Sequence, residues 1–111
     1  MSSKLATWMP IYWGDYWRDT ANLSCAQHGA YLNLIGECWV RRGALPLDDD
    51  ELWRLARADG LKHWQSIKDK VMRLFQKGDA AYRHKRVDEE LIRQARHQLV
   101  QSEQGKLGAE V

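Results

Sequence analysis

LSCAQHGAYLNLIGECWVRRG, residues 23–43, is the stretch of the chain that decides the fold. Ser24 and Gln27 have the spacing of a capping box, in which the hydroxyl accepts a free backbone N–H and the amide reaches back. At the other end Gly43 supplies a left-handed stop, and two arginines precede it where the helix dipole is negative. The residues between leave only a narrow polar strip. We therefore predict one long helix, covered on several sides, on which the rest of the chain packs.

The composition is that of one globular domain: 111 residues, of which 44% are hydrophobic and 29% charged. No run of about 18 apolar residues could span a membrane, and the N-terminus lacks the apolar stretch of a signal peptide. Cys25 and Cys38 lie 13 residues apart on the same predicted helix, too far to bridge. We expect free thiols in a reducing cytoplasm.

Aromatic side chains crowd residues 8–20, WMPIYWGDYWRDT, and the whole chain has six tryptophans, most of which we expect in the core. Pro10 and Gly14 should break any regular helix here, so we predict an extended piece and a turn, with Asp15 capping a short helical turn over residues 16–23. Two interpretations are open: an aromatic lid over the core, or a platform for stacking bases. We favour the lid, because stacking platforms are usually accompanied by cations and this stretch has only Arg18.

Two helices are predicted after the long one. Leu45-Pro46-Leu47 can form a single edge-strand rung, since the proline lacks the N–H that a central strand needs. Asp48 and Glu51 have capping-box spacing, which predicts a helix over residues 49–58 that stops at Gly60. The next helix, residues 62–75, has an apolar face of Trp64, Ile67, Val71, Leu74 and Phe75 and an opposite face of Lys62, Gln65, Ser66, Asp69, Lys70 and Arg73.

A basic hairpin should follow. Residues 74–76 and 81–84 can pair as strands around a turn at 77–80, and the return brings Arg83, Lys85 and Arg86. Alternation on a strand would put Arg83 and Lys85 on one side, whereas Arg86 is the one we expect to be tied to a carboxylate of the last helix. That helix is predicted over residues 87–100, with a buried side of Leu91, Ile92, Ala95 and Leu99.

Together these elements predict a mostly α fold with a small β-hairpin (α+β), namely a winged helix-turn-helix with an aromatic N-terminal lid and a C-terminal fourth helix. We expect residues 1–7 to be a flexible arm, residues 8–101 to form the single domain, and residues 102–111 to be a frayed tail.

The charge is unevenly distributed. Residues 62–97 hold ten Lys or Arg against five Asp or Glu, within a chain whose formal net charge is only +2. From charge alone two interpretations are open: a face for a polyanion, or a solvated surface that happens to be rich in lysine. We predict that duplex DNA is the partner, with the third helix in the major groove and the hairpin on a phosphate or in the minor groove. The candidate contacts are Lys62, Gln65, Ser66, Lys70, Arg73, Lys77, Arg83, Lys85 and Arg86.

Nothing in the sequence has the spacing of an active site. The four histidines lie on four different predicted elements, and no glycine-rich phosphate loop is present. The acidic run at residues 48–51 suits helix capping better than a metal site, because consecutive acids on a helix point in different directions. We expect no enzyme, no cofactor and no metal.

Three segments resemble a family of phage and prophage proteins described only as a domain of unknown function: residues 10–24, PIYWGDYWRDTANLS; residues 29–52, GAYLNLIGECWVRRGALPLDDDEL; and residues 84–91, HKRVDEEL. The resemblance covers about residues 10–92. It implies a phage origin, a winged-helix, replication-initiation-like fold, a role near DNA replication in the cytoplasm of a host bacterial cell, and no catalytic residues.

Two hypotheses follow for the function. In the first, the chain is a DNA-binding module accessory to replication initiation. In the second, it is an adaptor or inhibitor that docks on a host replication or defence complex, with Trp8 and Trp13 as exposed anchors of the contact. The sequence does not indicate an oligomeric state.

Overall fold

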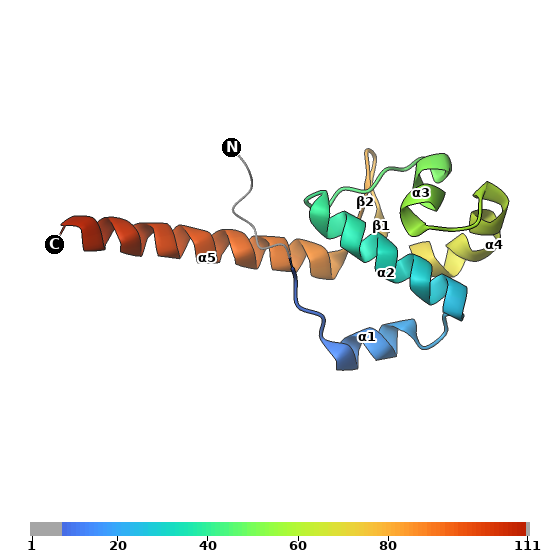
Figure 1. The fold of residues 1–111 in the computed structure, drawn as a ribbon, viewed down its shortest axis with the longest axis horizontal. Helices are drawn as coiled ribbons and strands as arrows, with labels where there is room; N and C mark the ends of the chain where they lie inside the picture. Colours follow the sequence, from blue (N-terminus) through green and yellow to red (C-terminus); the bar gives the residue numbers. More distant parts are fainter. Residues whose placement is uncertain (1–7, 111) are drawn as a thin grey trace.

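The computed structural model describes residues 8–110, with side chains for residues 8–100, so the predicted arm of residues 1–7 lies outside the described part. Within that part the chain is mostly helical with one two-stranded antiparallel sheet, which confirms the predicted α+β composition. In order (Figure 1) the elements are α1 Trp13–Thr20, α2 Cys25–Val40, α3 Asp49–Ala56, α4 Leu61–Met72, β1 Gln76–Lys77, β2 Tyr82–Arg83 and α5 Lys85–Glu110.

Helix α2 is the centre of the fold, as predicted, because it packs against α3, α4 and α5. Its capping box is formed: the Gln27 N–H donates to Ser24 Oγ at 3.2 Å, and the Ser24 N–H donates to Gln27 Oε1 at 2.8 Å. Six of its residues are buried, Ala30, Tyr31, Leu34, Ile35, Cys38 and Trp39. Leu32 and Val40, however, are exposed, so the polar strip is wider than the sequence suggested.

Gly43 stops the chain after α2 in the left-handed region, with φ +99°, as predicted. Arg42 adopts φ 65° just before it. The side chains of Arg83 and Asp88 lie directly against Gly43, so that a Cβ at this position would collide with both. The glycine is therefore needed for the backbone conformation and for this close approach.

The predicted capping box at the start of α3 is wrong. Asp48 makes no side-chain cap hydrogen bond. Its neighbour Asp49 instead accepts from Trp64 Nε1 at 3.0 Å and from Lys68 Nζ at 2.7 Å, which joins the start of α3 to α4. The predicted end of this helix is also corrected: α3 ends at Ala56, because Arg57 takes the left-handed conformation with φ 63°, ahead of Gly60.

Helix α4 has the two faces that its sequence predicted. Trp64, Val71 and the following Phe75 are buried, and the six residues of the opposite face are exposed. The helix is shorter than the predicted residues 62–75, since it ends at Met72 and turns carry the chain to β1.

The sheet is a short hairpin in which Gln76 pairs with Arg83 and Lys77 with Tyr82. Its strands lie one to two residues away from the predicted ones, and the Gly78 N–H closes the turn by donating to Ala81 O at 2.9 Å. Leu45 forms an isolated antiparallel bridge with Tyr82, through two hydrogen bonds of 2.9 Å. The predicted single rung at Leu45 is thus confirmed.

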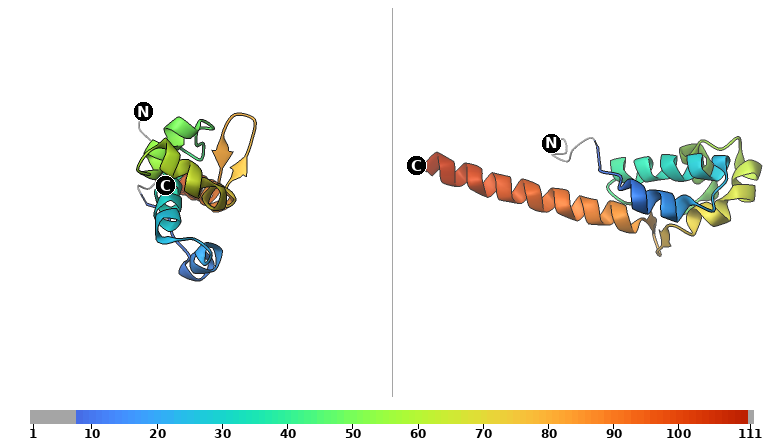
Figure 2. Two further views of the ribbon diagram at one scale, coloured as in Figure 1. Left: turned by 90° about the vertical axis from the view of Figure 1, so that its right-hand side faces the viewer. Right: turned by 90° about the horizontal axis from the view of Figure 1, so that it is seen from below.

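Helix α5 is longer at both ends than the predicted residues 87–100, and it extends well away from the other elements (Figures 1 and 2). Its first turns carry the buried Val87 and Glu90. The predicted buried side is wrong beyond Leu91, because Ala95 and Leu99 are exposed, as is Ile92. The helix continues through residues 102–110, and fraying of that tail stays a prediction.

Residues 8–20 differ most from the sequence expectation. Gly14 lies inside the helix α1, and Asp15 is in its first turn instead of capping a later one. Tyr16 is the aromatic side chain of this segment that is buried, whereas Trp8, Trp13 and Trp17 are exposed. Only Trp39 and Trp64 of the six tryptophans are buried, so the expectation that most lie in the core is wrong. In Figure 1 and the left view of Figure 2, α1 lies to one side of α2, opposite α3.

Across residues 8–110, none of the helices is both long enough and apolar enough to cross a membrane.

Candidate nucleic-acid interface

The outer face of α4 carries exposed polar and cationic side chains. Lys62, Lys70 and Arg73 form no ion pair with any carboxylate of residues 8–100. Gln65 is exposed between them, and Ser66 Oγ donates to the His63 carbonyl at 2.6 Å, so that its hydroxyl proton is already used. The three cations of this face are therefore not neutralised by ion pairs. The face also carries one acidic side chain, that of Asp69, which is exposed on the same helix.

Free cations are also found on the hairpin and at the start of α5. Lys77 on β1 and Lys85, the first residue of α5, are exposed and likewise lack an ion-pair partner within the side chains that the structure describes. Lys85 starts a helix and does not alternate with Arg83 along a strand, so the predicted placement of these two on one side of a strand is wrong.

Arg83, predicted to contact DNA, is engaged within the protein. Its Nε donates to both carboxylate oxygens of Asp88, at 3.2 and 3.0 Å, and its Nη2 donates to Asp88 Oδ1 at 2.7 Å. The hydrogen bond with Asp88 raises the pKa of Arg83. This fork-shaped pair lies against Gly43 and ties β2 to α5 and to the end of α2.

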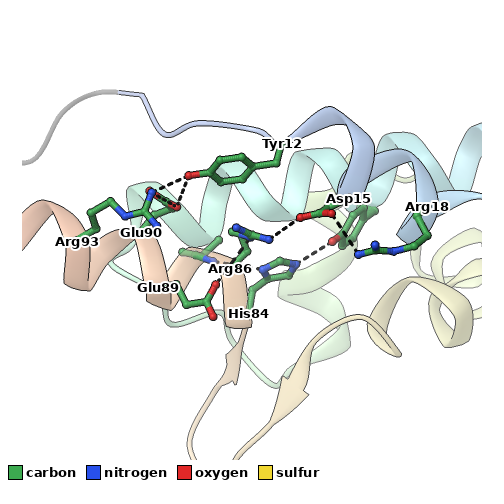
Figure 3. Close-up of polar contacts among 10 residues, drawn as sticks. Tyr12, Asp15, Arg18, His84, Arg86, Glu89, Glu90 and Arg93 are labelled. Atoms are coloured by element: carbon green, nitrogen blue, oxygen red, sulfur yellow. Dashed lines mark hydrogen bonds and ion pairs between the residues drawn. The ribbon is translucent and has the colours of Figure 1, made fainter.

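Arg86 is engaged as well (Figure 3). Its Nη2 donates to Asp15 Oδ2 at 2.9 Å, and its Nε lies 3.8 Å from Glu89 Oε1. The guanidinium carbon also sits 4.5 Å from the centre of the Tyr12 ring. The prediction that a carboxylate of the last helix ties Arg86 is confirmed, but the shorter contact is with Asp15 on α1, which sequence reasoning missed.

A second link joins residue 12 to α5 (Figure 3). The Tyr12 hydroxyl donates to Glu90 Oε2 at 3.2 Å and accepts from Arg93 Nη1 at 2.7 Å. Glu90 is almost fully buried, and Arg93 lies 3.4 Å from its carboxylate. The segment before α1 is therefore joined to α5 by polar contacts of Tyr12.

His84, between β2 and α5, is buried with its ring nitrogens satisfied. The Val87 N–H donates to Nδ1 at 3.4 Å, so Nε2 carries the proton and lies 2.8 Å from the Tyr31 hydroxyl. Burial lowers the pKa of His84 and raises that of Tyr31. The same cause raises the pKa of the buried Cys38 to about 11, and both cysteines are free thiols as predicted.

The hollows on the surface of the described residues include two large ones outside α4. One, of about 270 Å³, opens between α1 and the start of α5 and has a polar lining that includes Arg18, His84, Lys85 and Arg86. The other, of about 330 Å³, is an apolar groove on α2 lined by Trp8, Met9, Ile11, Leu32, Ile35, Gly36, Trp39 and Val40. No group of three or more His, Cys, Asp or Glu side chains within the described residues could hold a metal ion.

Comparison with known proteins places this set of elements in a family. The family model "Protein of unknown function (DUF1376)" matches residues 7–91. The chain belongs to this family. It is also similar to "Uncharacterized protein YdaU" of Escherichia coli (strain K12), with 30% identity over 84 residues, which cover 76% of this chain and 28% of that protein. The chain thus spans under a third of the length of this relative. No solved structure matches it.

The nine residues predicted to contact DNA separate into two groups in this family member. Seven are exposed without an ion pair to a described carboxylate, namely Lys62, Gln65, Ser66, Lys70, Arg73, Lys77 and Lys85; Arg83 and Arg86 are paired. Sequence spacing predicted that a carboxylate of the last helix would pair with Arg86, and the i,i+3 pair with Glu89 is that contact. The contact between Arg86 and Asp15 joins residues 71 positions apart, and no local pattern signals it.

Proposed function

We propose that this chain is a winged-helix DNA-binding protein of phage or prophage origin, accessory to replication initiation, which uses α4 and the hairpin on duplex DNA. The order of elements supports the winged-helix fold: a central helix, a strand rung at Leu45, two helices joined by a short turn, and a hairpin whose second strand pairs with that rung. In such a fold α4 is the helix that enters the major groove, and the hairpin is the wing.

One observation carries the proposal: five exposed cations on the outer face of α4, on β1 and at the first residue of α5 form no ion pair within residues 8–100, whereas Lys68 on the inner side of α4 and Arg86 of α5 are paired. Free cations release counterions when they meet phosphates, and paired ones do so far less. The five free cations of this surface are Lys62, Lys70, Arg73, Lys77 and Lys85.

Fluorescence anisotropy with a random-sequence duplex, measured at several salt concentrations, tests the proposal. With up to five phosphate contacts, the logarithm of the affinity should fall against log[salt] with a slope of about −4.5. The double variant Lys70→Ala/Arg73→Ala should reduce the magnitude of that slope by about two units and weaken binding to every sequence alike.

A matched control removes the same charge elsewhere. Arg41→Ala/Arg54→Ala takes away two exposed arginines that pair with Glu37 and Asp50. Its duplex affinity should fall much less than that of the α4 variant. Equal losses in the two double variants, or a salt slope near zero for the unmodified protein, would reject the duplex-binding surface.

Sequence preference should depend on Gln65. Its side-chain amide can both donate a hydrogen bond to a base edge and accept one from it. The hydroxyl proton of Ser66, in contrast, is already donated to the His63 carbonyl. Gln65→Ala should therefore flatten the discrimination between binding sites more than Ser66→Ala does, as measured by competition among duplexes of different sequence.

A second candidate, a protein-binding adaptor for a host replication or defence complex, is favoured by the apolar groove on α2. Trp8 is 64% exposed at this groove, and exposed tryptophans are frequent anchors of protein contacts. Capture of one stoichiometric partner from nuclease-treated host lysate, lost in Trp8→Ala, would favour the adaptor. Capture of DNA-dependent material alone would exclude it.

A further inference from the structure

The apolar groove on α2 contains a glycine between two exposed apolar side chains. Leu32, Gly36 and Val40 follow one another at intervals of four residues and so form one ridge along α2. Leu32 is 40% exposed and Val40 is 72% exposed. Trp8, on the segment before α1, lines the same groove and is largely exposed as well. The ridge therefore has a gap at Gly36, with apolar side chains around it.

Nothing in the described part of the chain requires a glycine at position 36. Gly36 lies inside a helix, and a Cβ added there would meet no atom of another element within 4 Å. This differs from Gly43, where Arg83 and Asp88 fill the space. A glycine in a helix interior lowers the stability of the helix relative to alanine. What it offers on an exposed face is room for the close approach of a second backbone.

The face of α2 around this gap carries no unpaired charge. Between Cys25 and Gly36 the helix has no Asp, Glu, Lys or Arg, and Glu37 beyond it pairs with Arg41 at 3.4 Å. Residues next to a two-fold axis meet their own copies, so that a charged side chain there would face a like charge. A face of this kind suits a second copy of the same chain, whereas a partner recognised by its charge would find no counterpart here.

The exposed apolar area of the groove is large enough for a weak dimer. Trp8, Leu32 and Val40, with the partly exposed Met9 and Ile11, present on the order of 300–400 Å² of apolar surface. Protein interfaces are about 55–65% apolar, so two such faces correspond to a total interface of about 1,000–1,300 Å². That is near the lower limit of a specific interface, for which a dissociation constant in the micromolar range is expected.

We propose that two copies of this chain pair through the apolar groove, with their α2 helices crossing at Gly36. Ridges of residues four apart interlock at a crossing angle of about −50°, so that the helices are closest at one point and diverge beyond it. A glycine from each copy at that point lets the backbones approach, and Leu32, Val40 and Trp8 of each copy pack around it. The same patch is used on both copies, so the contact closes into a dimer and does not extend into a chain.

This dimer leaves the proposed duplex-binding surface free. None of the residues that line the groove belongs to α4 or to the hairpin. The left view of Figure 2 shows the hairpin and the segment before α1 on different sides of the molecule. The inference goes beyond the proposed function and does not depend on it, because pairing is measured without DNA.

Sedimentation-velocity ultracentrifugation of the full chain, from about 1 to about 200 µM, tests the pairing. The unmodified protein should change from monomer to dimer over this range. Gly36→Ala should raise the dissociation constant by about tenfold or more, because each copy then places a methyl group in the contact. The melting temperature of the Gly36→Ala monomer should be unchanged or higher, since the space is open and alanine favours the helix.

Gly14→Ala is the matched control. It makes the same change in α1, outside the groove, at a position where a Cβ also meets nothing within 4 Å, and it should keep the dimer. Val40→Lys brings a charge into the contact at a largely exposed position and should remain a monomer throughout the range.

Two outcomes would overturn the proposal. One is an unmodified protein that stays monomeric at the highest concentration. The other is dimerisation of Gly36→Ala and Val40→Lys with the dissociation constant of the unmodified protein, which would place the contact on another surface. A monomer that captures a host protein through Trp8 would also overturn it, and would assign the groove to the second candidate function instead.

Discussion

The chain has two basic regions of similar composition and different chemistry. On the outer face of α4 and on β1 the cations are exposed and unpaired within the described residues, and the paired cation of α4, Lys68, lies on its inner side against Asp49. Around the junction of β2 and α5, Arg83 and Arg86 are used by Asp88, Asp15 and Glu89. A count of Lys and Arg treats the two regions alike. A candidate nucleic-acid surface has to be identified by which cations remain free, and that depends on carboxylates far away in sequence, such as Asp15 for Arg86.

The two regions also differ in what holds them. Helix α4 is anchored by apolar burial, with Trp64 and Val71 completely inaccessible. The start of α5 and the segment before α1 are joined by hydrogen bonds of Tyr12 with the buried Glu90 and with the exposed Arg93. Substitutions can test this difference by comparing their effects on stability and on binding.

The largest loss of stability should come from substitutions in α2, whose buried side chains form the core shared by both regions. Leu34 and Trp39 of α2 are buried, so Leu34→Ala and Trp39→Ala should each lower the free energy of unfolding by about 2–5 kcal/mol. Urea denaturation followed by circular dichroism measures this loss. Unfolding free energies close to that of the unmodified protein would contradict the central position of α2.

A smaller loss should follow from Asp49→Ala, which separates the start of α3 from α4. The substitution leaves the completely buried Trp64 without its acceptor and removes the partner of Lys68. We expect the free energy of unfolding to fall by about 1–3 kcal/mol, the cost of an unsatisfied buried donor.

Asp48→Ala is the matched control, because Asp48 makes no cap hydrogen bond. Its effect should stay within about 0.5 kcal/mol. Equal losses for Asp48→Ala and Asp49→Ala would restore the capping box that the sequence predicted, and would remove the structural reason for the anchoring of α4.

Much of the fold could be predicted because it depends on local signals. The capping box of Ser24 and Gln27, the stop at Gly43, the apolar face of α4 and the rung at Leu45 all follow from residues close together in sequence. Periodicity was a weaker guide at α5, where Ile92 and Leu99 repeat at helical spacing and yet have no apolar partner in the described part of the chain.

The candidate site was less predictable, for a physical reason. A side chain such as that of Arg83 is a suitable ligand for either a phosphate or a carboxylate, and which one it meets depends on tertiary contacts. Likewise Gly14 was expected to break a helix, but the interactions of Tyr16 and Asp15 with α2 and α5 hold α1 together across it. Helix propensity is a weak preference that such contacts override.

Arg83→Ala should have a modest effect on stability and almost none on the affinity for duplex DNA. The pair with Asp88 is partly exposed, so the free energy of unfolding should fall by only about 0.5–1 kcal/mol. Duplex affinity and its salt slope should remain those of the unmodified protein, because Arg83 is already neutralised. A slope shallower by about one unit would show that Arg83 leaves Asp88 to contact a phosphate, and the two basic regions would then be one surface.

The smallest expected effect is a pH dependence that originates at the junction of β2 and α5. Burial lowers the pKa of His84 below its ordinary value of 6.5, an effect that the nearby Asp88, Asp19 and Glu89 only partly oppose. As the pH falls through 6.5, the unfolded chain therefore takes up a proton that the folded chain resists. The contribution of His84 to the free energy of unfolding is therefore fully present above pH 6.5, and it is lost as the pH falls towards the lowered pKa.

The measurement is urea unfolding at pH 7.5 and at pH 5.5 for the unmodified protein, His84→Gln and His97→Gln. His97 is exposed on α5 and serves as the control for loss of a histidine. The unmodified protein and His97→Gln should both be less stable at the lower pH, and His84→Gln should show a smaller difference between the two, whatever its absolute stability. The same difference in all three proteins would mean that the junction keeps its packing when His84 is protonated. In that case the protein would accommodate a charged His84 ring without loss of stability, although this ring is buried and lies in hydrogen-bond contact with Tyr31.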